Sequence, residues 1–425
     1  MRRLQLLFML IFVVSVCNSQ TSKQVSLSML YEALEQNHPI AGIMPAMDSS
    51  LAIQTRNMST IWYPKLDFNA TATWQSEVIE INIPFPGISI PSPDADQYKL
   101  TIDATQVIWD GGATKARKGL AESQNLAEKS VVKNEIYSLR EKINDAFYAV
   151  ILLDISSNQL KLMKDELQSR LESIQSGVRQ GVILESNMLS IQAEIVRLEQ
   201  KMLEIPSKKA SLISMIETFT GADLAENPEF ILSGLSNESE VTLFRPELES
   251  FELQKKVFDS MSDLTSKKRM PTLGAFVSAG YGKPGLNMLS NDWNTYVLAG
   301  AKLSWNIWDW NSTKREKQQL MIQKSIVNRR KESFCDAVNS QIESCLNDIH
   351  TLNQQLEKDE EIVSLLNTVK EKSSSKLDNG VISSSEYLSD FNSAARASLD
   401  MEYRKVLLDK EKTKLYFLMG KNLNQ

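Results

Sequence analysis

The sequence predicts a mainly α-helical fold with a membrane β-barrel, built as a tandem repeat of two β-strands and a long antiparallel coiled-coil hairpin. Three observations predict it. The phrase Ile-Trp-Asp occurs twice, beginning at Ile108 and Ile307, and Thr-Lys follows each Asp at the same distance. Segments that alternate polar and apolar residues precede each phrase. Long proline-free stretches with apolar residues every three or four positions follow it, which is typical of coiled-coil helices.

The two copies are offset by 199 residues over most of their length, so that Gly181 corresponds to Gly380. Upstream the offset is 207 residues, because Pro39 corresponds to Pro246. Copy one therefore contains eight extra residues (207 minus 199) between its strands. Self-similarity at a fixed period indicates a repeat architecture. The expected domains are repeat 1 at 20–222, an inter-repeat linker in an equatorial region at 223–245, and repeat 2 at 246–425.

The first residues, MRRLQLLFMLIFVVSVCNSQ, predict a secretory signal peptide at 1–19. Two arginines precede an apolar run that is too short to cross a bilayer. Cleavage after Ser19 suits the small-residue rule, while lipidation of Cys17 is the competing interpretation, which Val16 disfavours. No later stretch approaches about 18 consecutive apolar residues, so we expect no transmembrane helix after it.

Composition argues against several classes of function. An exported chain with a formal net charge of −6 is a poor candidate for nucleic-acid binding, which needs basic patches. Neither His38 nor His350 lies in a metal-ligand spacing, and common nucleophile and phosphate-binding motifs are absent. We therefore expect no catalytic residues, no metal and no cofactor. The remaining enzymatic alternative would use carboxylates alone.

Two strands are expected in each copy, at about 64–77 and 98–109 in copy one and at about 271–281 and 295–308 in copy two. Apolar and polar residues alternate along them, and strands of about ten residues suit a tilted crossing of a bilayer. The alternative interpretation is that each strand pair forms one face of a soluble β-sandwich. The polar residues of this alternation would line the lumen of a barrel, and they include Lys99, Asp103, Lys302 and Asn306.

Tryptophans occur at the ends of the expected strands, at positions 109, 305 and 308. Aromatic residues are enriched where a membrane meets water, so Trp109, Trp305 and Trp308 are interpreted as interfacial residues. Ordinary packing next to the membrane is the alternative interpretation.

Helical hairpins are expected at about 112–220, with a turn at Gly181, and at about 311–419, with a turn at Gly380. A first helix of about 65 residues would be about 100 Å long, far more than an ordinary globular helix. Glycine suits the left-handed position that ends a helix. The apolar seam is expected to resume after the turn at Leu189, Val196 and Leu203. The alternative interpretation is that these hairpins form a coiled-coil spacer with no other function.

Four strands cannot close a barrel, and an open sheet edge is untenable in lipid, where every backbone group must be paired. The chain should therefore oligomerise through its strands. A dimer would give eight strands whose side chains fill the interior, whereas a trimer would give twelve and leave a lumen. The helices would continue from the strands as a periplasmic tube. The sequence thus predicts a hollow conduit in an outer membrane.

Several phrases resemble the TolC-type outer-membrane efflux protein family. VIWDGGATKARKGLAES is similar to its strand-to-helix crossover, RQGVILESNML and DNGVISSSEYL to its two periplasmic turns, and RPELESFELQ to the start of its second copy. The resemblance covers essentially the whole mature chain. It implies a homotrimer with a twelve-stranded β-barrel on an α-helical barrel, located in the outer membrane of a Gram-negative bacterium. It also implies an exit duct of a tripartite efflux or type I secretion system, docked to a periplasmic adaptor and an inner-membrane pump. A non-conducting coiled-coil tether anchored in the outer membrane is the alternative function.

The resemblance also implies site residues. Family members often close the periplasmic tip with acidic residues six and nine positions after the second-turn glycine. Those positions here are Glu386 and Ser389, with Asp390 beside them, and the copy-one equivalent of Glu386 is the neutral Asn187. Glu386 also fits a capping box with Ser383, and both roles are compatible. The expected adaptor-docking turns comprise Gly181, Val182, Ile183, Gly380, Val381 and Ile382.

Overall fold

The computed structural model describes residues 24–79, 92–224, 228–235 and 241–423. The expected signal peptide at 1–19 and Cys17 lie outside these residues. The chain divides into two compact units, each made of segments from both copies of the repeat. We call them the sheet unit, Gly42–Val132 with Glu247–Phe334, and the hairpin unit, Met1–Ala41 with Lys133–Pro246 and Cys335–Gln425.

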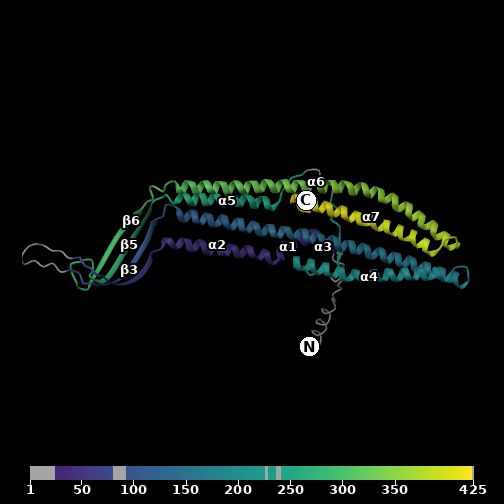
Figure 1. Ribbon diagram of the computed structural model, residues 1–425, viewed down its shortest axis with the longest axis horizontal. Coiled ribbons are helices and arrows are strands. Elements are labelled where there is room, and N and C mark those ends of the chain that lie inside the picture. Colours follow the sequence, from purple (N-terminus) through teal and green to yellow (C-terminus); the bar gives the residue numbers. More distant parts are fainter. Residues whose placement is uncertain (1–23, 80–91, 225–227, 236–240, 424–425) are drawn as a thin grey trace, which may run out of the picture. The chain divides into compact units, whose positions relative to one another are not determined.

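Helices of equal length lie at equivalent positions in the two copies. α3 (Ala113–Arg179) and α6 (Ser312–Asp378) have 67 residues each, and α4 (Glu185–Thr220) and α7 (Ser384–Met419) have 36 each. Every one of these bounds differs by 199 residues between the copies. α3 with α4 and α6 with α7 form two antiparallel hairpins (Figure 1).

The first helix of each hairpin ends in a Schellman motif. At the end of α3, the Val182 N–H donates to the Gly177 carbonyl at 3.0 Å and the Gly181 N–H donates to the Val178 carbonyl at 3.0 Å. Gly181 has φ +72° and Gly380, at the end of α6, has φ +68°. Because glycine adopts this left-handed conformation without strain, each glycine reverses the chain while the last helical carbonyls stay bonded.

Shorter elements precede the strands of each copy. In copy one these are β1 (Gln24–Val25), α1 (Leu27–Asn37), η1 (Pro39–Gly42), α2 (Ile43–Ser59) and η2 (Thr60–Trp62). β4 (Glu229–Phe230), within the expected inter-repeat linker, pairs in parallel with β1, and in copy two α5 (Pro246–Lys267) precedes the strands. Pro246 is the first residue of α5, a position that tolerates a proline because its N–H would have no helical partner.

Four strands form one antiparallel sheet in the sheet unit. Their order is β2 (Lys65–Trp74), β3 (Asp96–Trp109), β5 (Thr272–Lys283) and β6 (Asn294–Ser304). The inner pair β3 and β5 joins the two copies of the repeat, and β3, β5 and β6 run side by side in Figure 1. β2 and β6 are the two edges, each paired on one side only.

The last strand is shorter than the sequence indicates. A strand was expected over 295–308, but β6 ends at Ser304, so Trp305, Asn306 and Trp308 lie beyond it. The reason is the partner strand: Ser304 pairs with Thr272, the first residue of β5, and no ladder remains for the following residues. β3 extends to Trp109 because its last residues pair with β5 beyond the point where β2 begins.

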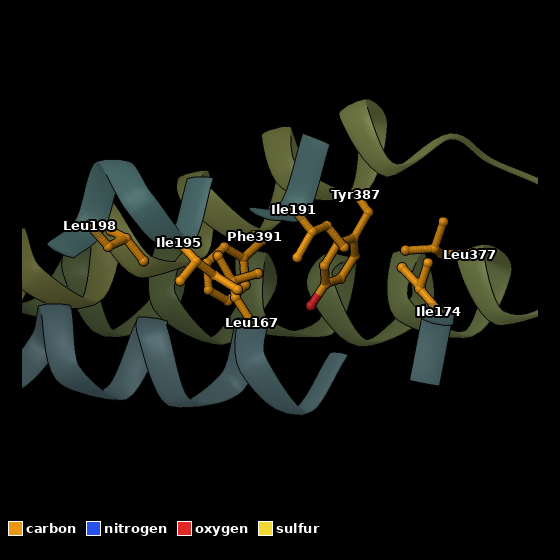
Figure 2. Packing of buried hydrophobic residues seen from close by; sticks show 8 residues of the cluster. All are labelled: Leu167, Ile174, Ile191, Ile195, Leu198, Leu377, Tyr387 and Phe391. Atoms are coloured by element: carbon orange, nitrogen blue, oxygen red, sulfur yellow. The ribbon is translucent and has the colours of Figure 1, made fainter. Parts of the chain in front are cut away.

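All four hairpin helices contribute to one apolar core near the turns (Figure 2). Phe391 of α7 is 1% exposed and Leu167 of α3 and Ile191 of α4 are both 0% exposed. The buried members of this cluster are Leu167, Ile174, Ile191, Ile195, Leu198, Leu377, Tyr387 and Phe391. The two hairpins are therefore held together within a single chain by burial of side chains from both copies.

The seam expected on α4 is wrong in its choice of residues. Leu189, Val196 and Leu203 are 53%, 63% and 78% exposed, whereas Ile191 and Leu198 of the same helix are buried. α4 has apolar residues on two faces, and only one face packs against the chain's own helices. The exposed set, spaced seven residues apart, forms a stripe without a partner among the described residues.

Candidate functional site

The sheet presents one apolar face to its surroundings. Leu66 and Phe68 of β2 are 71% and 70% exposed, and Val297 and Leu303 of β6 are 68% and 66% exposed. In a soluble protein such a face would be covered by another layer. The residues of this face include Leu66, Phe68, Ala70, Ala72, Leu100, Ile102, Ala104, Leu273, Ala275, Val277, Ala279, Val297, Ala299, Ala301 and Leu303.

A bulge in β3 places Trp109 on the apolar face. Val107 pairs with Gly274 and Trp109 pairs with the adjacent Leu273, so Ile108 is the extra residue. An extra residue reverses the alternation of faces beyond it. Trp109 is 46% exposed and shares the face of Leu273. Trp305 donates from its indole N–H to the Arg269 carbonyl at 3.1 Å, outside the strand, and Trp308 packs edge-on against Trp310.

The opposite face is polar and contains three of the four residues expected to line a lumen. Lys99 and Asp103 lie on β3 and Lys302 lies on β6, whereas Asn306 is outside the sheet. Asp103 accepts hydrogen bonds from Asn69 Nδ2 at 2.7 Å and from Thr101 Oγ1 at 2.8 Å. The bond from Asn69 links β2 to β3 across the face, and the bond from Thr101 lies within β3.

In copy two, aromatic rings cover glycines on this polar face, which sequence reasoning missed. A Cβ atom added at Gly280 would lie 2.2 Å from Tyr296 Cζ, and one added at Gly300 would lie 2.8 Å from Phe276 Cζ. Each ring therefore folds flat over the glycine that pairs with it across the ladder. Glycines within the strands of copy two, paired with aromatic residues across the ladder, are the sequence signal that could have indicated this arrangement.

The repeated phrase Ile-Trp-Asp builds the junction between strand and helix. Asp110 accepts hydrogen bonds from the N–H groups of Gly112 at 2.9 Å and Thr114 at 2.5 Å, and Asp309 accepts from the Thr313 N–H at 2.9 Å. Each aspartate thus satisfies free N–H groups at the start of α3 or α6. Burial acts to raise the pKa of Asp110, but hydrogen bonds from Thr114 and Gly112 outweigh it and hold that pKa below its usual value. Hydrogen bonds from Thr313 likewise lower the pKa of Asp309.

The two turns of the hairpin unit expose one valine each. Val182 and Val381 are 71% and 69% exposed, as expected for an uncovered tip. Ile183 and Ile382 differ from the expectation because they are partly buried and pack against the apolar cluster. Leu184, which follows Ile183 and lies outside the expected docking turn, is 72% exposed.

The residues expected at the aperture all lie beside the second turn. Glu386 forms the capping box, with the Ser383 N–H donating to Glu386 Oε2 at 3.0 Å and the Glu386 N–H donating to Ser383 Oγ at 3.3 Å. Asp390 accepts a hydrogen bond from Ser373 Oγ of α6. Asn187 Oδ1 accepts from the Ser384 N–H at 3.2 Å and so joins the start of α4 to the start of α7. Ser389 is exposed.

Arg170 of α3 links the two hairpins, which the sequence did not reveal. Its guanidinium pairs with Asp378 at 2.7 Å, donates to the Ser374 carbonyl at 2.5 Å, and lies 5.2 Å from the centre of the Tyr387 ring. The Arg170 side chain is only 11% exposed. Burial, together with the Glu166 carboxylate, raises the pKa of Tyr387 to about 12, so this ring stays neutral.

Other chemistry is limited in the part of the chain that the structure describes. That part has no group of three or more His, Cys, Asp or Glu side chains placed to hold a metal ion. None of its helices has the combination of length and apolar character needed to cross a membrane. Cys335 and Cys345 are free thiols, and burial with the nearby Glu411 raises the pKa of Cys345 to about 12.

No protein-family model matches the sequence, and no curated protein matches it. Several solved structures match it. The outer membrane protein VceC of Vibrio cholerae is 15% identical with a TM-score of 0.66, covering 93% of this chain and 96% of its own. The CmeC outer membrane channel of Campylobacter jejuni is 13% identical with a TM-score of 0.64, covering 93% and 85%. The MtrE outer membrane channel of Neisseria gonorrhoeae is 13% identical with a TM-score of 0.64, covering 93% and 89%.

These matches extend over nearly the whole of this chain at low identity, so they concern the fold. The chain therefore has the fold of outer membrane channels, and its predicted resemblance to the TolC-type outer-membrane efflux protein family is confirmed at the level of that fold.

Proposed function

We propose that the chain is an outer membrane channel of a Gram-negative bacterium, the exit duct of a tripartite efflux or type I secretion system. The single observation that carries this proposal is the sheet, which has an exposed apolar face, a polar face and two unpaired edges. A closed barrel in lipid satisfies all three features at once, because it pairs the edges and turns the apolar face to the membrane. The matched channels support this choice.

Three copies give a twelve-stranded barrel with a lumen, lined by the polar face of the sheet. The helical hairpins form the periplasmic part, and the turns with Val182, Leu184 and Val381 dock a periplasmic adaptor and, through it, an inner-membrane pump. Exposed apolar side chains at such a tip favour a surface that a partner covers. The channel itself performs no chemistry, and the pump supplies the energy.

Glu386 and Asp390, with Ser389 and Asn187, are proposed to surround the periplasmic aperture. Asp390 lies four residues after Glu386 on α7, one helical turn further along the same face. Three copies bring six carboxylates together, and rings of acidic side chains favour cations. Glu386 also forms the capping box of α7, and that role is compatible with a place at the aperture.

Single-channel recording in a planar bilayer tests the proposal. Purified trimer should give long-lived openings, and Glu386→Gln/Asp390→Asn should lower the preference for cations. Unchanged selectivity in the double variant would keep the channel but leave Glu386 as a helix cap only. A verified trimer that stays closed even with its adaptor present would favour the non-conducting tether.

A further inference from the structure

Charge is distributed unevenly over the polar face of the sheet. Copy one contributes Lys65, Asp67, Lys99 and Asp103, whereas Lys302 is the one charged residue that copy two contributes to this face. Three lysines against two aspartates leave one net positive charge in each chain.

The two aspartates are already engaged. Asp67 pairs with Lys65 at 2.9 Å, so these two charges cancel locally. Asp103 is held midway along β3 by hydrogen bonds from Asn69 and Thr101. These hydrogen bonds fix the position of the Asp103 carboxylate against the sheet. Its charge still counts toward this face, so the net charge of the face remains one positive charge in each chain.

Lys99 and Lys302 make no ion pair with any described residue. Lys99 Nζ lies 5.8 Å from the centre of the Tyr296 ring, a cation–π contact that leaves its charge intact. Lys302 pairs across the ladder with Gly274, which has no side chain to oppose it. Both lysines are exposed on the polar face.

The register separates these lysines along the barrel. Lys99 aligns with Gly282 near one end of β5, and Lys302 aligns with Gly274 near the other end. The two glycines are eight residue steps apart (282 minus 274), which corresponds to about 26 Å of strand. Three copies would therefore form one ring of lysines near each mouth of the barrel.

We propose that these two lysine rings make the barrel lumen selective for anions, opposite in sign to the acidic set at the helical tip. This inference rests on the proposed trimeric channel. Rings of basic side chains select anions in pores, and interior substitutions tune the selectivity of membrane barrels. The cargo class that passes this stretch most readily is then a small anion, or an anionic group on a larger molecule.

The test measures reversal potentials in a KCl gradient, in the Glu386→Gln/Asp390→Asn background so that the tip does not mask the barrel. Recordings use about 0.1 M salt, at which the field of an exposed charge is screened beyond about 10 Å. The background channel should prefer chloride. Adding Lys99→Gln/Lys302→Gln should lower the chloride-to-potassium permeability ratio by about twofold or more. Lys99→Arg/Lys302→Arg should preserve it.

Lys283→Gln is the matched control. Lys283 lies at the same end of the sheet as Lys99 but on the other face, where it pairs with Asp94 at 2.6 Å. Its replacement should leave the reversal potential unchanged. A conducting channel whose selectivity ignores the glutamine substitutions would overturn this inference and leave the proposed function intact. A verified trimer that never conducts would overturn both.

Discussion

Asp110 and Asp309 explain why one short phrase occurs twice. Each lies between a strand of the sheet and a 67-residue helix, and accepts a hydrogen bond from an N–H group at the start of that helix. Their pKa values lie below the usual value, so each carboxylate stabilises the fold when it is charged. The stability they contribute is present above the usual aspartate pKa and is lost as pH falls through the lowered folded pKa.

We therefore expect the unfolding free energy to fall with acidification below about pH 4. Asp110→Asn/Asp309→Asn should flatten this part of the pH profile, because asparagine caps a helix without titrating. Denaturant unfolding followed by circular dichroism at a series of pH values measures it. A profile of the same steepness in the double variant would contradict the assignment.

Gly111 should be the least replaceable glycine of the junction. It has φ +66°, and an added Cβ would lie 2.4 Å from Met270 Cβ. Gly111→Ala should destabilise the chain by more than about 1–2 kcal/mol, the strain of a left-handed alanine alone. Gly119→Ala is the control, since Gly119 has open space around it inside α3 and alanine there should stabilise by about 0.5–1 kcal/mol. Thermal unfolding that ranks the two variants in the other order would refute the junction geometry.

Arg170 should be the strongest single polar link between the hairpins. Arg170→Ala removes the Asp378 pair, the bond to the Ser374 carbonyl and the Tyr387 contact together. We expect a loss of about 2 kcal/mol. Lys370→Ala breaks the pair with Glu166 at 3.1 Å between the same helices. The Lys370 side chain is 24% exposed against 11% for Arg170, and its replacement should lose less than about 1 kcal/mol. Denaturant midpoints of both variants measure the two losses of stability. Equal losses would mean that the Arg170 contacts contribute no more than an ordinary surface ion pair.

At the scale of the elements, the sequence predicts helices better than it predicts exposure. Proline-free stretches and left-handed glycines define the hairpin helices because both signals are local. Which face of α4 is buried depends on where α3 and α7 lie, and Ile191 and Leu198 are buried there in place of the expected Leu189 and Val196. The end of β6 differs from the expectation for a similar reason, since its partner strand begins at Thr272.

The candidate site shows the same limit. Glu386 could be read as a capping residue from its spacing to Ser383 alone. Arg170 could not be found, because its partners lie more than 200 positions away in the chain (378 minus 170 is 208 for Asp378) and no local pattern relates them. The fold itself was predictable as that of an outer membrane channel, since it follows from repeated local signals.

The exposed stripe on α4 should matter for assembly and not for the single chain. Replacing Leu189, Val196 and Leu203 by glutamine leaves the buried face of α4 intact, so far-UV circular dichroism should not change. The heptad spacing suits a neighbouring helix of another copy. We expect the triple variant to shift from trimer to monomer in analytical ultracentrifugation. Glutamine at Lys201 and Glu204, two polar positions of the same helix, is the control, and equal dissociation by it would dismiss the stripe.

For the whole molecule, the decisive feature is the pair of open edges. Adjacent strands in the order β2, β3, β5, β6 are all antiparallel, so β6 of one copy can continue the alternation by pairing with β2 of the next. In lipid this pairing is required, because each unpaired backbone group would cost several kcal/mol. Ring closure therefore predicts that β2 and β6 are neighbours between chains.

Cysteine cross-linking tests that prediction directly. Thr71→Cys on β2 is combined in turn with a cysteine at each polar-face position of β6, beginning with Leu298→Cys and Ser304→Cys. Residues opposed across a strand pair are close enough to form a disulfide, so at least one combination should give a ladder of dimer and trimer on denaturing gels. Thr71→Cys with Ser278→Cys is the control, because β5 is flanked by β3 and β6 and has no free edge. Interchain bonds in the control, or none in the whole β6 series, would show that the edges close in some other way.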